Sequence, residues 1–106
     1  MKYQVWYMRP EYFADGYNMP NIAKIYNLEQ SHKYLLDLEA NSLEEIWCKM
    51  QAEVWSPNGE ARPLIRAKGL HHTSMSVGDI VVDRHSNVYV AKMFGFKLMG
   101  VRNRNA

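Results

Sequence analysis

The chain has 106 residues, of which 47% are hydrophobic and 23% are charged, with a net charge of +2 at pH 7. Disorder is excluded because it requires low hydrophobicity and a high net charge. The single cysteine, Cys48, cannot close an intrachain disulfide, so nothing indicates an oxidising compartment. The sequence shows neither a signal peptide nor a run of about 20 apolar residues. We therefore expect a cytoplasmic protein with one domain over residues 1–101 and a mobile basic tail over 102–106.

The first third of the chain contains two predicted strands separated by an irregular stretch. Residues 2–8 mix β-branched and aromatic types and carry large side chains at both alternating sets of positions. This pattern predicts a strand covered on both faces. Residues 9–31 are interrupted by Gly, Pro and Asn. Residues 32–39 predict a second strand with Tyr34, Leu36 and Leu38 on one face, in which Leu35 interrupts an otherwise alternating pattern.

The middle of the chain predicts one main helix over 42–54 and a short second helix over 60–68. Ser42 and Glu45 form a capping box, in which each side chain bonds the backbone amide of the other residue. The apolar residues behind it recur at helical spacing, and Glu45 and Lys49 form a favourable i,i+4 pair. In the second helix Pro63 is tolerated only near the first turn, and Gly69 suits a left-handed position after the end.

The last third predicts three strands, over 76–83, 87–93 and 96–101, joined by two short turns. Short turns favour an antiparallel meander. The expected architecture is α+β: a curled antiparallel sheet or partly open barrel of about five strands, with helices 42–54 and 60–68 on one side.

One polar run carries the first set of candidate functional residues: His71, His72, Thr73, Ser74, Ser76 and Asp79. The favoured interpretation is structural, with hydroxyls satisfying backbone amides, Asp79 holding a turn, and Gly78 supplying an unusual φ. The alternative is a small hydrolase or metalloenzyme centred on 71–85, which also contains Asp83 and His85. No HExxH, CxxC or GxSxG spacing supports that alternative, so we expect no metal and no cofactor.

A second set of residues suits contact with a partner: Trp55, Lys92, Phe94, Lys97, Arg102 and Arg104. Trp55 either anchors a partner or folds back over the helix end. The basic residues lie in a C-terminal stretch that contains no acid after Asp83, so one end of the molecule should be positive. Basic and aromatic residues also alternate in strands that bind single-stranded nucleic acid. With few charges, such binding would be weak, and we expect a protein partner instead.

The C-terminal half resembles the YodL-like family. The resemblance rests mainly on residues 72–82, HTSMSVGDIVV, and extends to Tyr89-Val90 and Gly95-Phe96. Leu43-Glu44-Glu45-Ile46 and Tyr3-Gln4-Val5-Trp6 are similar to the family's helix start and opening strand. The resemblance implies a small accessory protein of phages, plasmids or conjugative elements. It implies no catalytic residues, and it favours a non-enzymatic protein that binds a protein partner.

Overall fold

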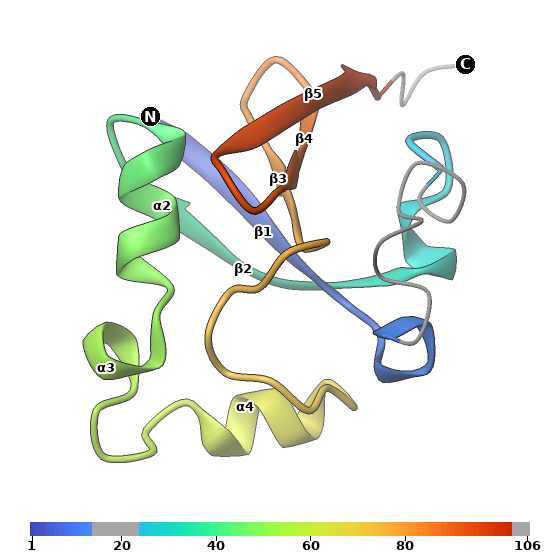
Figure 1. Cartoon of the computed structure of the whole chain (residues 1–106). Coiled ribbons are helices and arrows are strands. Elements are labelled where there is room, and N and C mark those ends of the chain that lie inside the picture. The colour runs from blue at the N-terminus through green and yellow to red at the C-terminus, as the bar shows by residue number, and fades with distance from the viewer. Residues whose placement is uncertain (14–23, 103–106) are drawn as a thin grey trace.

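Five strands form one open, antiparallel sheet in the computed structural model, which describes residues 1–13 and 24–102 (Figure 1). The strands are β1 (Lys2–Met8), β2 (His32–Glu39), β3 (Ile80–Val82), β4 (Asn87–Ala91) and β5 (Phe96–Val101). Their order across the sheet is β2-β1-β3-β4-β5, so β1 is an interior strand between β2 and β3, and β5 lies at one edge. The predicted α+β class with a curled, unclosed sheet is confirmed, as is the antiparallel meander of the last three strands.

Side chains of β1 enter two separate hydrophobic clusters, one on each face of the sheet. Tyr3, Val5 and Tyr7 belong to cluster 1, on the face that the helices cover. Trp6 and Met8 belong to cluster 2, on the opposite face. Burial on both faces confirms the prediction for this strand, and each fully buried large apolar side chain contributes about 1.5–3 kcal/mol.

A β-bulge between β1 and β2 explains the interrupted pattern at Leu35. Val5 pairs with Leu36 and Trp6 pairs with Tyr34, which leaves Leu35 as the extra residue. The extra residue lets Leu35 and Leu36 both pack on cluster 1, while Tyr34 packs on cluster 2. The predicted common face for Tyr34, Leu36 and Leu38 is therefore wrong, because the bulge reverses the alternation.

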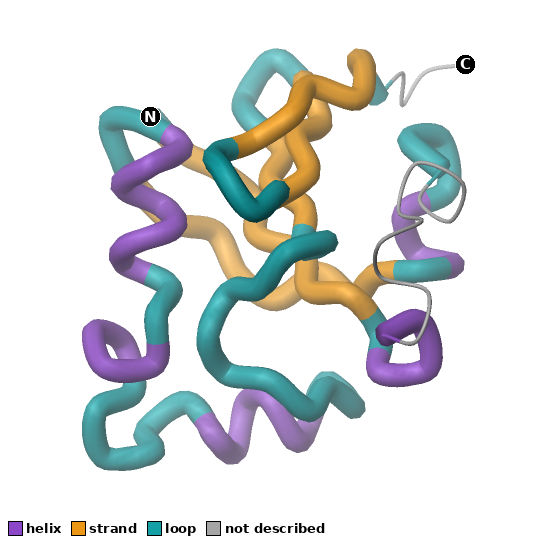
Figure 2. Tube along the Cα trace, viewed as in Figure 1, coloured by secondary structure: helices purple, strands orange, loops and turns teal. Residues whose placement is uncertain are grey.

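Three short helices lie along one side of the sheet: α2 (Leu43–Lys49), α3 (Ala52–Trp55) and α4 (Arg62–Ala67). On the other side the 3-10 helix η2 (Leu28–Gln30) packs Leu28 into cluster 2. Figure 2 shows the two groups of helical segments flanking the strands. Pro63 lies in the first turn of α4, and Gly69 follows its end at φ 70°, both as predicted. None of the described helices combines the length and apolar character that a membrane crossing requires.

The predicted helix 42–54 is present in two pieces, because the chain turns out of helical conformation at Met50 and Gln51. Gln51 is extended, with ψ 140°. The Met50 carbonyl accepts from the Met75 amide at 3.1 Å, and the Gln51 side chain donates to the carbonyls of Trp47 and Met75. The two bonds with Met75, in a distant segment, take the place of helical ones. Beyond the break, Val54 is 57% exposed and does not extend the buried stripe.

Of the two hydrogen bonds predicted for the capping box at the start of α2, only the one accepted by Ser42 is present. The Ser42 hydroxyl accepts from the Glu45 amide at 3.1 Å. The Glu45 carboxylate instead accepts from the amide of Asn41, one residue before the cap, and pairs with Lys49 at 2.9 Å. Cys48, on the same helix, is exposed.

The predicted strand 76–83 is shortened to β3, because residues 76–79 form a turn. The Asp79 amide donates to the Ser76 carbonyl at 3.0 Å, and Gly78 adopts φ 99°. This conformation is the unusual φ that the sequence led us to expect of Gly78. The turn places Asp79 at the entrance of β3, beside the end of β1.

Candidate functional site

Residues 71–79, here called the polar segment, cross from α4 to β3 and are tied to the sheet and to the α2–α3 junction. The Thr73 carbonyl accepts from the Tyr7 hydroxyl at 2.7 Å and from the Trp55 indole at 3.1 Å. Burial raises the pKa of Tyr7 above its ordinary value, with the Asp79 charge adding to the effect, so the phenol stays protonated as a donor. The segment is therefore anchored through its backbone.

Asp79 is fully buried and accepts three hydrogen bonds. Its carboxylate oxygens lie 2.8 Å from the Met8 amide, the Ser76 amide and His72 Nε2. A buried carboxylate is tolerated when donors satisfy it in this way. Asp79 thus connects the end of β1 to the polar segment, which extends the turn-holding role expected for it.

His72 lies between this carboxylate and two aromatic rings. Its imidazole stacks on Tyr7, with ring centroids 4.4 Å apart, and meets Phe13 edge-on at 4.9 Å. Because the carboxylate accepts at Nε2, that nitrogen carries the hydrogen. The other nitrogen, Nδ1, is buried and has no hydrogen-bond partner among the described residues.

The two serine hydroxyls of the polar segment bond to backbone rather than to His72. Ser74 Oγ accepts from the Ala52 amide at 2.8 Å, which satisfies the first amide of α3. Ser76 Oγ donates to the Ser74 carbonyl at 3.1 Å. His71 is exposed. The structure therefore brings His72, Ser76 and Asp79 together, and it directs Ser74 toward a helix start.

Asp83 and His85 lie at the other end of β3, in the turn to β4. There the Asp83 carboxylate accepts from the amides of His85 and Asn87, both at 2.9 Å. Within residues 1–13 and 24–102, no three His, Cys, Asp or Glu side chains are grouped closely enough to hold a metal ion.

His32 is a buried polar residue that the sequence did not single out. It is fully buried, its Nδ1 lies 2.7 Å from the Ser31 hydroxyl, and its Nε2 lies 2.8 Å from the Gly78 carbonyl. A carbonyl only accepts, so Nε2 carries the hydrogen and Nδ1 accepts from Ser31. Burial lowers the pKa of His32, against the opposing effect of the bond to Gly78. In the sequence His32 merely begins a strand.

The turn between β4 and β5, together with β5, presents the second candidate region. We call it the β5 surface, and its exposed residues are Met93, Phe94, Lys97, Leu98 and Val101. Phe94 is 95% exposed and Met93 is 72% exposed. On the same strand Phe96 instead packs against Trp47 in cluster 1. Large apolar side chains are thus exposed to solvent in the turn that leads into β5, although β5 itself is anchored to cluster 1 through Phe96.

The backbone of β5 has a free edge within the part of the chain that the structure describes, where it pairs with β4 alone. The Lys92 amide donates to the Gly95 carbonyl at 2.8 Å, and Val90 pairs with Lys97 two positions further along. Hydrogen-bonded pairs alternate with non-bonded pairs in an antiparallel ladder. The amides and carbonyls of Phe96 and Leu98 therefore point away from β4, toward the edge.

The other predicted partner-binding residues do not all join this surface. Trp55 packs on cluster 1 and donates to Thr73, which is the fold-back alternative. Lys92 is half-buried at the turn. Arg102 pairs with Glu29 and lies over the Trp6 ring at 5.1 Å, so the fold holds its side chain. Arg104 and the rest of the predicted tail, 103–106, lie outside the described residues.

Comparison of the chain with family models, with curated proteins and with solved structures gives no match. In the polar segment the serine hydroxyls form hydrogen bonds with backbone groups. The β5 surface, in contrast, exposes apolar side chains that nothing among the described residues covers.

Proposed function

We propose that this protein is a non-enzymatic binding protein whose β5 surface receives an extended segment of a protein partner. The observation that carries the proposal is the near-complete exposure of Phe94 beside Met93. Exposed large apolar groups that cluster together are characteristic of interaction sites. Aromatic anchors of this kind contribute a large share of binding energy when a partner buries them.

The free edge of β5 favours strand addition as the mode of binding. The outward backbone groups of Phe96 and Leu98 offer hydrogen bonds to an added strand. The exposed side chains of Leu98 and Val101 then contact alternate side chains of the partner. In this mode the partner's backbone forms a hydrogen-bonded ladder with β5, and Phe94 at the turn inserts into the partner.

Charge favours an acidic partner segment. Lys97 is exposed on β5, and the sequence contains no acidic residue after Asp83. A lysine on an edge strand opposes pairing with a second copy of the same strand. It attracts a segment in which acidic residues alternate with apolar ones.

The resemblance of residues 72–82 to the YodL-like family supports the same role, because it implies a small accessory protein. Nucleic acid is the alternative ligand. It is less favoured because Arg102, one of the few basic residues at this end, is already paired with Glu29. Affinity for nucleic acid depends on the number of phosphate contacts.

The test measures binding of a peptide in which glutamate alternates with valine, with a lysine–valine peptide as the charge control. The acidic peptide should bind the native protein and the basic peptide should not. Phe94→Ser should weaken binding at least tenfold, whereas Tyr26→Ser, which removes a 77% exposed aromatic elsewhere, should not. Tight binding of a single-stranded oligonucleotide instead, fading steeply with salt, would favour the alternative.

A further inference from the structure

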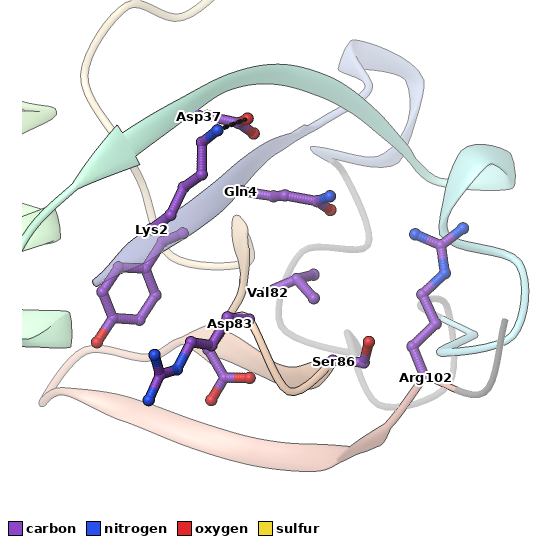
Figure 3. A pocket seen from close by; sticks show the side chains of 9 residues that line it. Lys2, Gln4, Asp37, Val82, Asp83, Ser86 and Arg102 are labelled. Atoms are coloured by element: carbon purple, nitrogen blue, oxygen red, sulfur yellow. Dashed lines mark ion pairs between the residues drawn. The ribbon is translucent and has the colours of Figure 1, made fainter.

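A polar cavity of about 180 Å³ opens on the cluster-2 face of the sheet, away from the β5 surface's exposed turn (Figure 3). Its floor is a row across three strands, because Gln4 pairs with Asp37 on one side and with Val82 on the other. Figure 3 shows Gln4 extending past Val82 toward Arg102. The β3–β4 turn contributes Ser86 to the wall.

The two carboxylates that line the cavity are already satisfied by their neighbours. Asp37 accepts from the Tyr34 hydroxyl at 2.7 Å and pairs with Lys2 at 3.5 Å. Asp83 accepts three bonds within its own turn, two from Asn87 and one from His85. Partial burial acts to raise the pKa of Asp83, but these bonds outweigh it and lower the pKa. Neither carboxylate therefore needs a further donor.

Other groups around the cavity, in contrast, carry hydrogen-bond donors that have no acceptor among the described residues. The Trp6 indole donates to Gln4 Oε1 at 3.1 Å, and an indole N–H is a donor only. This bond fixes the orientation of the amide, so Gln4 Nε2 is left to donate. Arg84 forms no ion pair with any described residue, and its one hydrogen bond among them joins Nε to His85 Nε2 at 3.3 Å. Its terminal nitrogens are available.

Arg102 contributes donors rather than an unpaired charge, because its ion pair with Glu29 engages Nη2 and leaves other guanidinium N–H groups to donate. Its side chain is only 11% exposed, bonded to Glu29 and lying over the Trp6 ring. A guanidinium recognises carboxylate and phosphate oxygens because its N–H groups form a planar fork. With Arg84 and the Gln4 amide, the cavity is lined by donors from β1, from the β3–β4 turn and from the residue that follows β5.

We propose that this cavity binds a small oxyanion, the carboxylate or phosphate group of a ligand, between Gln4, Arg84 and Arg102. Few, convergent polar groups in a small concavity are what orient a charged ligand group. This site is distinct from the free edge of β5, because Gln4 lies on β1 and Arg84 in the β3–β4 turn, and only Arg102, which follows β5, adjoins that strand.

The experiment is an NMR titration of the full chain with inorganic phosphate and, separately, with acetate, with sodium chloride holding ionic strength constant. The Gln4 side-chain amide and the Ser86 backbone amide should shift and saturate with at least one anion. Arg84→Ala should weaken the saturating shifts at least tenfold. Arg66→Ala, which removes an exposed arginine of α4, should leave them unchanged.

Gln4→Glu provides a second, nearly isosteric variant. It keeps an acceptor for the Trp6 indole and replaces the donor amide with a second carboxylate oxygen, so an unchanged Trp6 indole signal reports an intact fold. Anion binding should be lost. Linear, unsaturated shifts with both anions, or saturation that survives Arg84→Ala, would overturn the proposal.

Discussion

Asp79 and His72 form a hydrogen-bonded pair, 2.8 Å from carboxylate to Nε2, that is buried at the end of β1. The same carboxylate accepts the amides of Met8 and Ser76. One side chain thus holds together segments that are 71 residues apart in the sequence. The pair resembles part of a catalytic arrangement, but both serine hydroxyls nearby bond to backbone. Its geometry therefore supports a structural role, and we call the Asp79 carboxylate with its three donors from Met8, His72 and Ser76 the clasp.

Asp79→Ala should therefore destabilise the fold by about 2–5 kcal/mol, because it leaves buried donors without acceptors. Urea unfolding followed by tryptophan fluorescence measures the loss. Asp37→Ala is the matched control: its carboxylate is 38% exposed, and its removal should cost less than about 1 kcal/mol. Equal, small losses in both variants would contradict the clasp.

Removal of the α2 cap should have a smaller effect. Ser42→Ala deletes the acceptor of the Glu45 amide and should cost about 0.5–2 kcal/mol. Asn41→Ala is the control, because Asn41 contributes its backbone amide to the Glu45 carboxylate. Thermal unfolding that ranks Asn41→Ala as the more harmful change would show that the cap has been placed wrongly.

Stability should fall in mild acid because of His32. Its pKa is lowered in the folded protein from 6.5, so the unfolded chain takes up the proton first. The stabilisation is full above about pH 6.5 and is lost as the pH falls below it, by at most about 1.4 kcal/mol per pH unit. Unfolding in urea at several pH values measures the slope.

His32→Gln should flatten this dependence, since glutamine retains a donor for the Gly78 carbonyl and does not titrate in this range. His85→Gln, which removes an exposed histidine, should leave the slope as it is. If the slope persists in His32→Gln, another group is responsible for the acid sensitivity.

Phe94 and Phe96 should respond oppositely to the same substitution. Phe94→Ser removes a side chain that is 95% exposed, so the free energy of unfolding should change by less than about 0.5 kcal/mol. Phe96→Ser removes a ring that packs on Trp47, and the free energy of unfolding should fall by about 1–4 kcal/mol, the order of magnitude known for buried aromatic residues. A large loss of stability in Phe94→Ser would mean that the turn serves the fold and not a partner.

Local sequence pattern predicted most of the sheet, since the strands 2–8, 32–39 and 96–101 are marked by β-branched and aromatic residues. It failed where distant contacts decide the outcome. The break after Lys49 depends on Met75, and the shortened β3 depends on the turn around Asp79. Neither contact is visible in the local spacing of residues.

The candidate sites divide in the same way. The sequence alone predicts Phe94 and Lys97 as candidate partner-binding residues. The strand order explains their exposure, because β5 is an edge strand of the sheet. Arg102 was expected to be free, but its partner Glu29 is 73 residues away. The clasp depends on Met8, at the far end of the chain from Asp79, and no local pattern identifies that partner.

Hydrogen exchange at individual amides of β5, measured with and without the acidic glutamate–valine peptide, tests the central claim most directly. The outward amides of Phe96 and Leu98 should become protected when the peptide binds. The amide of Lys97, which already faces β4, should not change. Peptide binding that leaves Phe96 and Leu98 unprotected, or that protects β2 instead, would contradict strand addition at this edge.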